Sequence, residues 1–358
     1  MNSFVVQQPV VNRDSVGFML NDPDRLYERV TLFQELQRPR LGPSFERVPN
    51  GWSLQFPRPA VDRMEYLIHV VARNGMESLI TDPKNSNRAP GPFGHKSVIE
   101  WPEYRAPGWL APSHERVGAI AEHTIDSQSL RPVTRLQLWS SHGTDPGDSL
   151  PLLIAHDGPE YDKFSRLTTL LDAKCETGDL PPMRAALLTP ADRDLTYSAS
   201  AAYARILAHE ILPWLRRHTP SPEGRWARVG AGASLGALAM LHAHRAYPAA
   251  LGALFLQSGS FFRPRHDKQE SSFVRFRRVT RFIEQVLATN EWPEPIPVTM
   301  TCGVVEENMY NNLALAHAMR AQGYSVSLAE HRDAHNWVSW RDTFDPHLVD
   351  LLRRVWTR

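Results

Sequence analysis

The sequence predicts an α/β protein with a mainly parallel sheet, preceded by a small all-β region. From about residue 123 onward, short apolar runs alternate with segments of helical periodicity, which is the pattern of strand–helix–strand units. Between about residues 46 and 71, short alternating runs are separated by Pro and Asn-Gly signals, which is typical of a small antiparallel sandwich. Because 358 residues suit two domains, we expect one at 1–122 and one at 123–358.

The N-terminal region is predicted to hold one helix, two clear strands and an irregular strap. Residues 24–36 could form an amphipathic helix ahead of the strands. The strands are expected at 52–56 and 64–71, where apolar and polar residues alternate. Residues 81–112 are rich in Pro, Gly and Asn and show little periodicity, so we expect an ordered strap there rather than a helix.

The C-terminal region is predicted to alternate strands and helices. Continuous apolar runs such as Leu150-Pro-Leu-Leu-Ile-Ala suit strands buried on both faces. Gly323 suits the left-handed position that ends a helix. Strands are expected at 130–140, 150–155, 184–189, 225–231, 250–257, 297–302 and 324–330, and helices at 201–218, 235–247, 308–322 and 342–356.

The charge balance and the cysteine usage limit the possible partners and cofactors. Forty basic residues face 39 acidic ones, so neither nucleic acid nor an anionic membrane is an expected partner. Cys175 and Cys302 have no zinc-ligand spacing, and two cysteines suit a reducing compartment. Residues 1–20 lack a secretion-signal pattern, and no apolar run reaches the length of a spanning helix. We expect a cytoplasmic protein without metal or cofactor, and leave its oligomeric state open.

The strongest motif is the pentapeptide Gly232-Ala-Ser234-Leu-Gly236. An apolar strand precedes it and an Ala/Leu-rich helix follows, which is the context of a nucleophile elbow, where small neighbours let a serine hydroxyl project above the sheet. The alternative is a glycine-lined tight turn with an idle serine. We predict Ser234 to be a catalytic nucleophile.

A serine nucleophile needs a base and an acid. His335 follows a predicted strand and precedes the terminal helix, where the base of the α/β-hydrolase fold falls in the order serine, acid, histidine. The acid is expected after the penultimate strand, where Glu306 and Glu307 both stand, and we favour Glu306. The other carboxylate could favour the N-terminus of the following helix.

Oxyanion stabilisation requires two backbone donors. The amide of Leu235, which follows the nucleophile, is the first. The second is expected in the loop after residues 152–154. Pro159 has no N–H, so the donor is Gly158 or a residue beyond the proline.

Seven segments together resemble the enterochelin (enterobactin) esterase-like branch of the α/β hydrolases. They lie between about residues 130 and 356 and occur in that family's order. The segments are Ile154-Ala-His-Asp-Gly with Tyr161, Arg193-Asp-Leu-Thr-Tyr197 through Tyr203, His209-Glu-Ile-Leu-Pro213-Trp, Gly232-Ala-Ser-Leu-Gly236, Leu256-Gln-Ser-Gly-Ser-Phe261, Gly303-Val-Val-Glu306-Glu-Asn308 and His335-Asn-Trp-Val-Ser-Trp340-Arg. The N-terminal third resembles the immunoglobulin-like sandwich of such esterases, through Trp52, Met64-Glu-Tyr66, Asp82-Pro and Phe93-Gly-His-Lys-Ser97.

This resemblance implies a serine esterase with the triad Ser234, Glu306 and His335. The sequence departs from the family where Asp333-Ala-His335 replaces the usual Gly-Gly-His. Family members cleave esters of catecholate siderophores, and relatives include feruloyl esterases and mycolyl transferases. The resemblance therefore implies a small-molecule ester substrate, with Arg193, Tyr197, Trp337 and Trp340 as candidate contacts. Core packing is the alternative role for the two tryptophans.

Two other functions remain open at this stage. An acyltransferase of the same fold would use the same serine and replace water with another alcohol. A non-catalytic ligand-binding protein would have no need of an intact set of serine, carboxylate and histidine.

Overall fold

The chain folds as two compact units in a computed structural model that describes residues 9–38, 40, 43–111, 117–125 and 134–357. The β unit comprises Met1–Arg105 together with two short segments from the C-terminal part of the chain, Gly303–Glu307 and His331–Ser339. The α/β unit comprises Ala106–Cys302, Asn308–Glu330 and Trp340–Arg358.

Two antiparallel sheets form the β unit and share one hydrophobic core. The core includes Phe18 of the first sheet and Tyr66 of the second, whose rings meet edge to face at 5.0 Å. The first sheet has the order β1 (Val10–Val11), β2 (Ser15–Asn21), β5 (Gly51–Pro57) and β4 (Glu46–Val48). The second has the order β3 (Tyr27–Gln34), β6 (Arg63–Ala72), β9 (Lys96–Glu100) and β8 (Arg88–Ala89), with β7 (Glu77–Ile80) paired to β6.

The helix predicted at residues 24–36 is wrong, because this segment forms strand β3. Val30, Leu32 and Gln34 are buried at every second position, and β3 pairs antiparallel with β6 along its length. An alternation of period two fits the pleat of a strand, and pairing with a distant strand overrides the local helical pattern. The strap expected at residues 81–112 does contain irregular chain, but it also contributes β8 and β9 to the sheet.

The α/β unit is built on an eight-stranded sheet that is antiparallel at one edge and parallel through its centre. This confirms the predicted α/β class. Residues 130–133 of the first expected strand lie outside the described residues. The strand order is β10 (Ala119–Ile125), β11 (Thr134–Ser140), β13 (Arg184–Thr189), β12 (Leu152–His156), β14 (Arg228–Ala233), β15 (Ala253–Gln257), β16 (Pro297–Gly303) and β17 (Ser325–His331).

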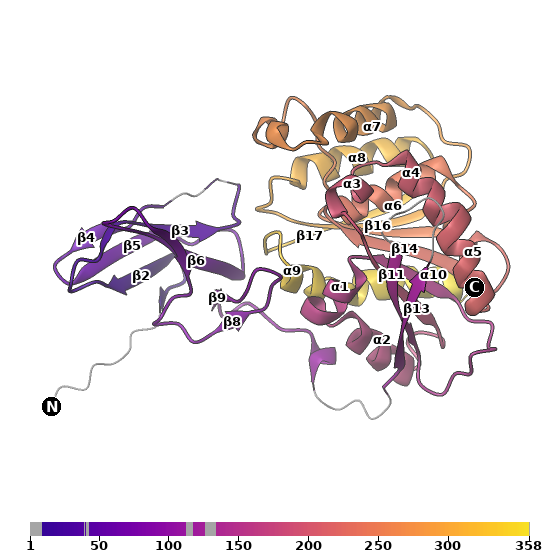
Figure 1. The fold of residues 1–358 in the computed structure, drawn as a ribbon, viewed down its shortest axis with the longest axis horizontal. Coiled ribbons are helices and arrows are strands. Elements are labelled where there is room, and N and C mark those ends of the chain that lie inside the picture. Colours follow the sequence, from indigo (N-terminus) through magenta and orange to yellow (C-terminus); the bar gives the residue numbers. More distant parts are fainter. Residues whose placement is uncertain (1–8, 39, 41–42, 112–116, 126–133, 358) are drawn as a thin grey trace. The chain divides into compact units, whose positions relative to one another are not determined.

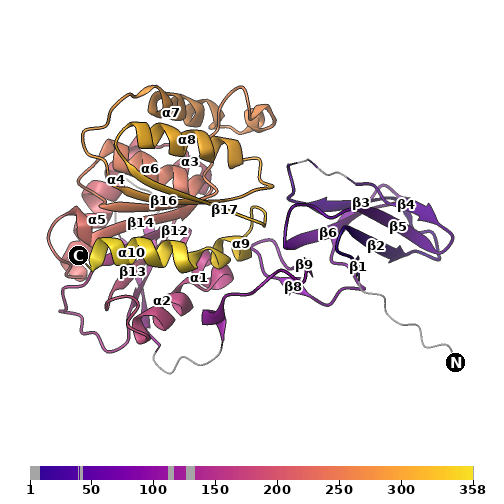
Figure 2. The ribbon, with the colours of Figure 1, turned by 180° about the vertical axis from the view of Figure 1, so that it is seen from behind.

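Helices cover both faces of this sheet (Figures 1 and 2), with α6 and α8 on one face and α1, α2 and α10 on the other. The α-helices are α1 (Gly158–Ser165), α2 (Leu167–Glu176), α3 (Arg193–Tyr197), α4 (Ala201–Ile206), α5 (Leu212–His218), α6 (Leu235–Ala246), α7 (Phe276–Ala288), α8 (Met309–Ala321), α9 (Trp337–Asp342) and α10 (Val349–Trp356). Short 3-10 turns span Gly108–Leu110, Arg225–Ala227 and Lys268–Ser272, and π-helical segments span Leu207–Ile211 and Phe344–Leu348.

The terminal helix starts later than predicted. Asp345 has an extended conformation, with φ −108° and ψ 119°, and Pro346 follows it. A residue before proline is biased away from helical geometry, so the regular helix begins only at Val349. Among the described residues, no helix combines the length and apolar character needed to cross a membrane.

Candidate active site

Ser234 occupies a sharp turn between β14 and α6. It has φ 55° and ψ −123°, a conformation that is rarely populated by residues other than glycine. The backbone amide of Ser234 donates to the carbonyl of Gln257 at 2.9 Å, which ties the turn to the neighbouring strand β15. Strain of this kind is expected at a nucleophile elbow, where the turn lifts the serine side chain away from both flanking elements.

The two glycines of the pentapeptide allow this turn to form. A Cβ atom on Gly232 would lie 2.5 Å from the carbonyl carbon of Gly236 and 2.9 Å from the amide nitrogen of Ala237. A Cβ atom on Gly236 would lie 3.2 Å from Cβ of His156. The strand and the helix therefore approach more closely at Gly232 than any side chain permits.

A second serine lies beside the candidate nucleophile. The hydroxyl oxygens of Ser234 and Ser260 are 3.0 Å apart, and the Ser260 amide donates to the Ser234 carbonyl at 3.1 Å. Ser260 is 3% exposed. Sequence reasoning did not assign it a role. The available signal was Ser258-Gly-Ser260, which directly follows β15, the strand next to the one that carries the elbow.

The two predicted oxyanion donors both stand at the first position of a helix. Leu235 begins α6 and Gly158 begins α1. The first amides of a helix have no acceptor within it and carry the positive end of the helix dipole. Because β12 and β14 are parallel neighbours, the two helices start at the same edge of the sheet. This arrangement suits the binding of a negatively charged oxygen.

An ion pair between a buried carboxylate and a partly exposed arginine supports the turn that precedes Gly158. Asp157 has φ 50° and its carboxylate accepts two hydrogen bonds from Nε of Arg193, at 2.9 and 3.1 Å. Burial raises the pKa of Asp157, while the charge and the hydrogen bonds of Arg193 act in the opposite direction. The Arg193 side chain is 40% exposed, so it is bonded to the loop on one side and open to solvent on the other.

Tyr197 lies behind this loop and is fully buried. Its hydroxyl accepts a hydrogen bond from the amide of Asp157 at 3.3 Å, and its ring stacks on His156 at 4.3 Å. Burial lowers the pKa of His156 to about 3. The neutral ring bonds the carbonyl of Gly236 through Nδ1 and the hydroxyl of Tyr203 through Nε2. Tyr197 thus packs against His156 and Asp157 in the interior rather than on an exposed surface.

The two predicted members of the acid–base pair meet within the β unit. Nδ1 of His335 lies 2.8 Å from Oε2 of Glu306. Glu306 is 1% exposed, and its Oε1 accepts a hydrogen bond from the amide of Gly303 at 2.8 Å. Of the two carboxylates expected in this loop, Glu306 therefore makes the bond to the imidazole. An Nδ1–H donated to Glu306 leaves the lone pair of the ring on Nε2.

The environment of His335 favours its protonated form. Burial by itself would lower the pKa of His335, but the charge and the hydrogen bond of Glu306 outweigh it, with smaller contributions from Glu35 and Glu307. The pKa is therefore raised above its ordinary value of 6.5. A carboxylate in this position stabilises the imidazolium that forms when the ring accepts a proton.

The two predicted tryptophans differ in their surroundings. Trp340 is 5% exposed, and its indole N–H donates to Oγ of Ser258 at 3.0 Å. This agrees with the packing alternative. Trp337 begins α9, belongs to the β unit and is partly exposed.

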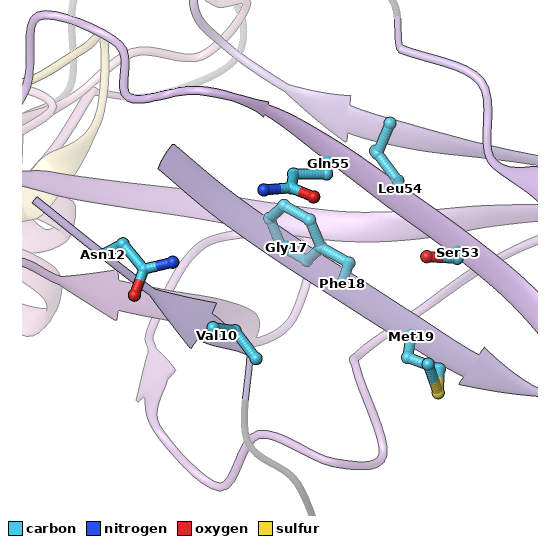
Figure 3. A pocket seen from close by; sticks show the side chains of 8 residues that line it. All are labelled: Val10, Asn12, Gly17, Phe18, Met19, Ser53, Leu54 and Gln55. Atoms are coloured by element: carbon cyan, nitrogen blue, oxygen red, sulfur yellow. The ribbon is translucent and has the colours of Figure 1, made fainter. Parts of the chain in front are cut away.

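A separate pocket of about 210 Å³ lies on the β1–β2–β5 sheet. Figure 3 shows Val10, Phe18 and Met19 among its lining side chains. Its lining contains no titratable group, so it offers neither an acid nor a base for bond cleavage. In the part of the chain that the structure describes, no group of three His, Cys, Asp or Glu side chains could hold a metal ion.

Comparison with known proteins identifies related esterases. The Esterase family model matches residues 131–261. The iron(III) enterobactin esterase of Escherichia coli K12 is 24% identical over 302 residues, which cover 83% of this chain and 72% of the relative.

Solved structures show the same fold. The ferric enterobactin esterase of Salmonella typhimurium has a TM-score of 0.77 at 20% identity, covering 97% of this chain and 96% of that one. A feruloyl esterase module of Clostridium thermocellum has a TM-score of 0.51 at 16% identity, covering 70% of this chain and 93% of that one. In sequence this chain is similar to enterobactin esterases, and it shares their fold.

Proposed function

We propose that this chain is a serine esterase that hydrolyses carboxylic esters through an acyl-enzyme, with Ser234 as nucleophile, His335 as base and Glu306 as acid. The observation that carries the proposal is the strained elbow that holds Ser234 at φ 55° at the start of α6. The hydrogen bond between His335 and Glu306 supports the assignment of the other two residues.

The proposed reaction has two steps. Ser234 Oγ attacks the acyl carbon while Nε2 of His335 accepts its proton, and the amides of Leu235 and Gly158 bind the oxyanion. The ester C–O bond breaks, and the leaving alcohol takes the proton from His335. Water then attacks the acyl-enzyme and gives a proton to His335. The bond between the acyl carbon and Ser234 Oγ breaks, Ser234 Oγ takes that proton back, and the carboxylic acid leaves. Glu306 fixes the tautomer of the imidazole throughout.

The proposed substrates are small esters of aromatic acids, of the siderophore or hydroxycinnamoyl type. Support comes from similarity to proteins named enterobactin esterase and, in fold, to a feruloyl esterase module. The half-exposed Arg193 is the proposed contact for an anionic or phenolic group, and the partly exposed Trp337 for an aromatic ring. Tyr197 and Trp340 are buried, so we assign them to the support of these contacts.

Two further assignments rest on the same resemblance. We propose that the β unit, apart from its two C-terminal segments, is an immunoglobulin-like sandwich. We also propose a cytoplasmic location, which is supported by the use of two cysteines in 358 residues.

The first test is hydrolysis of short-chain p-nitrophenyl esters by the wild-type protein and by Ser234→Ala. We expect kcat of the variant to fall by about 10⁴-fold or more, because the remaining groups cannot form the acyl-enzyme. Ser325→Ala, on the exposed start of β17, is the matched control and should retain activity. An inert wild type, or an active Ser234→Ala variant, would refute the proposal. Product analysis with added alcohols separates hydrolysis from acyl transfer.

A further inference from the structure

Two catalytic loops belong structurally to the β unit although they follow strands of the α/β unit. The acid loop, Gly303–Glu307, follows β16, and the histidine loop, His331–Ser339, follows β17. Val305 and Ala334, one from each loop, are 1% and 5% exposed and lie within the core cluster of the β unit. The residues next to Glu306 and His335 are therefore part of the same apolar core as the N-terminal strands.

Backbone hydrogen bonds attach both loops to the N-terminal part of the chain. The amide of Gln37 donates to the carbonyl of Val305 at 2.9 Å, and the amide of Asp62 donates to the carbonyl of Arg332 at 2.8 Å. The loops are also joined to each other, because the amide of Val304 donates to the carbonyl of His331 at 2.9 Å. These bonds fix the main chain just before each member of the acid–base pair.

The guanidinium of Arg63 adds a buried polar anchor. Arg63 is the first residue of β6 and is 2% exposed. It donates to Oε1 of Glu65 at 2.7 Å, to Oδ2 of Asp333 at 3.4 Å and to Oδ1 of Asn336 at 3.3 Å. Asp333 and Asn336 stand two residues before and one residue after His335. A single side chain from the N-terminal strands therefore bonds the histidine loop on both flanks of the candidate base.

The residues of the histidine loop that Arg63 contacts also make hydrogen bonds within the loop. Oδ1 of Asp333 accepts hydrogen bonds from the amide of Ala334 at 2.7 Å and from Nδ2 of Asn336 at 3.0 Å. Oδ1 of Asn336 also accepts from the amide of Ser339 at 2.8 Å. The turn that presents His335 thus has its polar groups fixed by the two residues that Arg63 contacts.

The charges of the cluster favour an ionised arginine shared by two carboxylates. Burial would lower the pKa of Arg63, but Glu65 and Asp333 raise it above its ordinary value. Burial raises the pKa of Asp333 to about 7, although Arg63 and the hydrogen bonds from Ala334 and Asn336 lower it. Glu65 is the nearer partner and supplies the main counter-charge.

We propose that Arg63 is a positioning residue for catalysis, through which the N-terminal strands hold His335 in register with Glu306. This inference deepens the proposed function and rests on it. Arg63 touches neither substrate nor reacting atoms. It acts through Asp333 and Asn336, and the loss of its two contacts on the histidine loop would let the imidazole shift relative to the carboxylate.

The test compares Arg63→Met with Arg63→Lys in the full-length protein. Lysine keeps the charge but has one ammonium group in place of the fork, in which Nη2 bonds Glu65 while Nη1 bonds Asp333 and Asn336. Displacement of a catalytic group by about 1 Å costs roughly 100-fold in rate. We expect kcat for p-nitrophenyl acetate, per folded protein, to fall by about that factor in Arg63→Met and by a smaller factor in Arg63→Lys, with little change in KM.

The pH profile separates positioning from a purely structural role. If the contact between His335 and Glu306 loosens, the raised pKa of His335 returns toward its ordinary value, and the acid limb of kcat/KM moves to lower pH. Lower stability alone would reduce the folded fraction and leave this limb in place. Arg29→Met is the matched control, because Arg29 lies on β3 of the same unit with its side chain 61% exposed.

The outcomes distinguish this inference from the proposed function. Suppose that the wild type is active and Ser234→Ala is inactive. Folded Arg63 variants that keep the wild-type kcat and the wild-type acid limb would then overturn the positioning role and leave the proposed function in place. If Arg63→Met does not fold, Arg63→Lys decides by the same two measurements. A wild type without esterase activity would instead refute the proposed function.

Discussion

The bond between His335 and Glu306 joins a half-exposed imidazole to a carboxylate from which solvent is almost excluded. The side chains are 31% and 1% exposed, and the two atoms are 2.8 Å apart. A charge-assisted bond with one partner buried is stronger than a surface ion pair, because water screens it less. The same bond sets the tautomer of the ring and the pH at which the ring becomes a base.

The pH dependence of the wild type follows from this bond. A base must be neutral to accept a proton, so kcat/KM should rise with pH through the raised pKa of His335, with its midpoint above 6.5. The contribution of His335 to the free energy of unfolding changes with pH in the opposite direction. The raised pKa contributes stability that is fully present below about pH 6.5 and is lost as pH rises through the folded-state pKa.

Glu306→Gln should lower kcat and move the acid limb. A glutamine can donate to Nδ1 and so stabilise the wrong tautomer, which costs about 10⁴-fold in a comparable triad. Without the carboxylate, burial dominates the pKa of His335, and the acid limb should move to lower pH. The measurement is kcat/KM for p-nitrophenyl acetate between about pH 5 and 9, the range over which a histidine titrates.

Glu307→Gln is the matched control for this prediction. It lies one residue further along the same loop, and its charge makes a smaller contribution to the pKa of His335 than Glu306 does. Its kcat should stay close to the wild-type value. If Glu307→Gln were the more damaging change, the assignment of the triad acid to Glu306 would be incorrect.

At the scale of elements, the close approach of β14 and α6 determines the geometry of the elbow. Gly232→Ala would place Cβ 2.5 Å from the carbonyl carbon of Gly236. The neighbouring atoms are backbone, so no side chain can turn aside. Overpacking of this kind costs about 1–3 kcal/mol, and the strain falls on the turn that carries Ser234.

We therefore expect Gly232→Ala to lower both the free energy of unfolding and kcat. Urea denaturation and p-nitrophenyl acetate hydrolysis measure the two quantities. The control is Gly147→Ala, because Gly147 is exposed and a Cβ atom there would meet nothing within 4 Å. If Gly232→Ala and Gly147→Ala had the same denaturation midpoint and the same rate of hydrolysis, β14 and α6 could separate without loss of stability or activity.

The elements near Ser234 were predictable from the sequence because their signals are local. The run that ends at the elbow, the glycines and the following helix lie within twenty residues of one another. The error at β3 has the opposite cause. Its strand state depends on pairing with β6 about forty positions away in the chain, as in the pair Val30 and Val70, and no local pattern encodes that partner.

The supports of the site were not predictable for the same reason. Arg63 and Asp333 are 270 positions apart in the chain, and neither belongs to a motif that requires the other. Ser260 stands in one of the segments that resemble the esterase family, but nothing in the sequence indicates that its hydroxyl lies beside that of Ser234. Contacts of this type depend on which strands become neighbours, and that information appears only in the folded chain.

At the scale of the whole molecule, the candidate catalytic residues are divided between the two units. Ser234 belongs to the α/β unit, while Glu306 and His335 belong to the β unit. Local opening occurs in cooperative groups of contacts that do not have to follow the order of the chain. The acid and histidine loops should therefore open with the N-terminal strands rather than with the sheet from which they emerge.

Hydrogen exchange measured by mass spectrometry can test this grouping with two core substitutions. Ile68→Ala removes a fully buried side chain from the core of the β unit, and Leu254→Ala removes one from the core of the α/β unit. Each should cost about 2–5 kcal/mol. In Ile68→Ala, we expect faster exchange in Gly303–Glu307 and His331–Ser339 together with β5 and β6. In Leu254→Ala, the faster exchange should centre on β14, β15 and α6. If exchange in Gly303–Glu307 and His331–Ser339 instead became faster in Leu254→Ala, the α/β sheet, and not the N-terminal strands, would hold the acid–base pair in place.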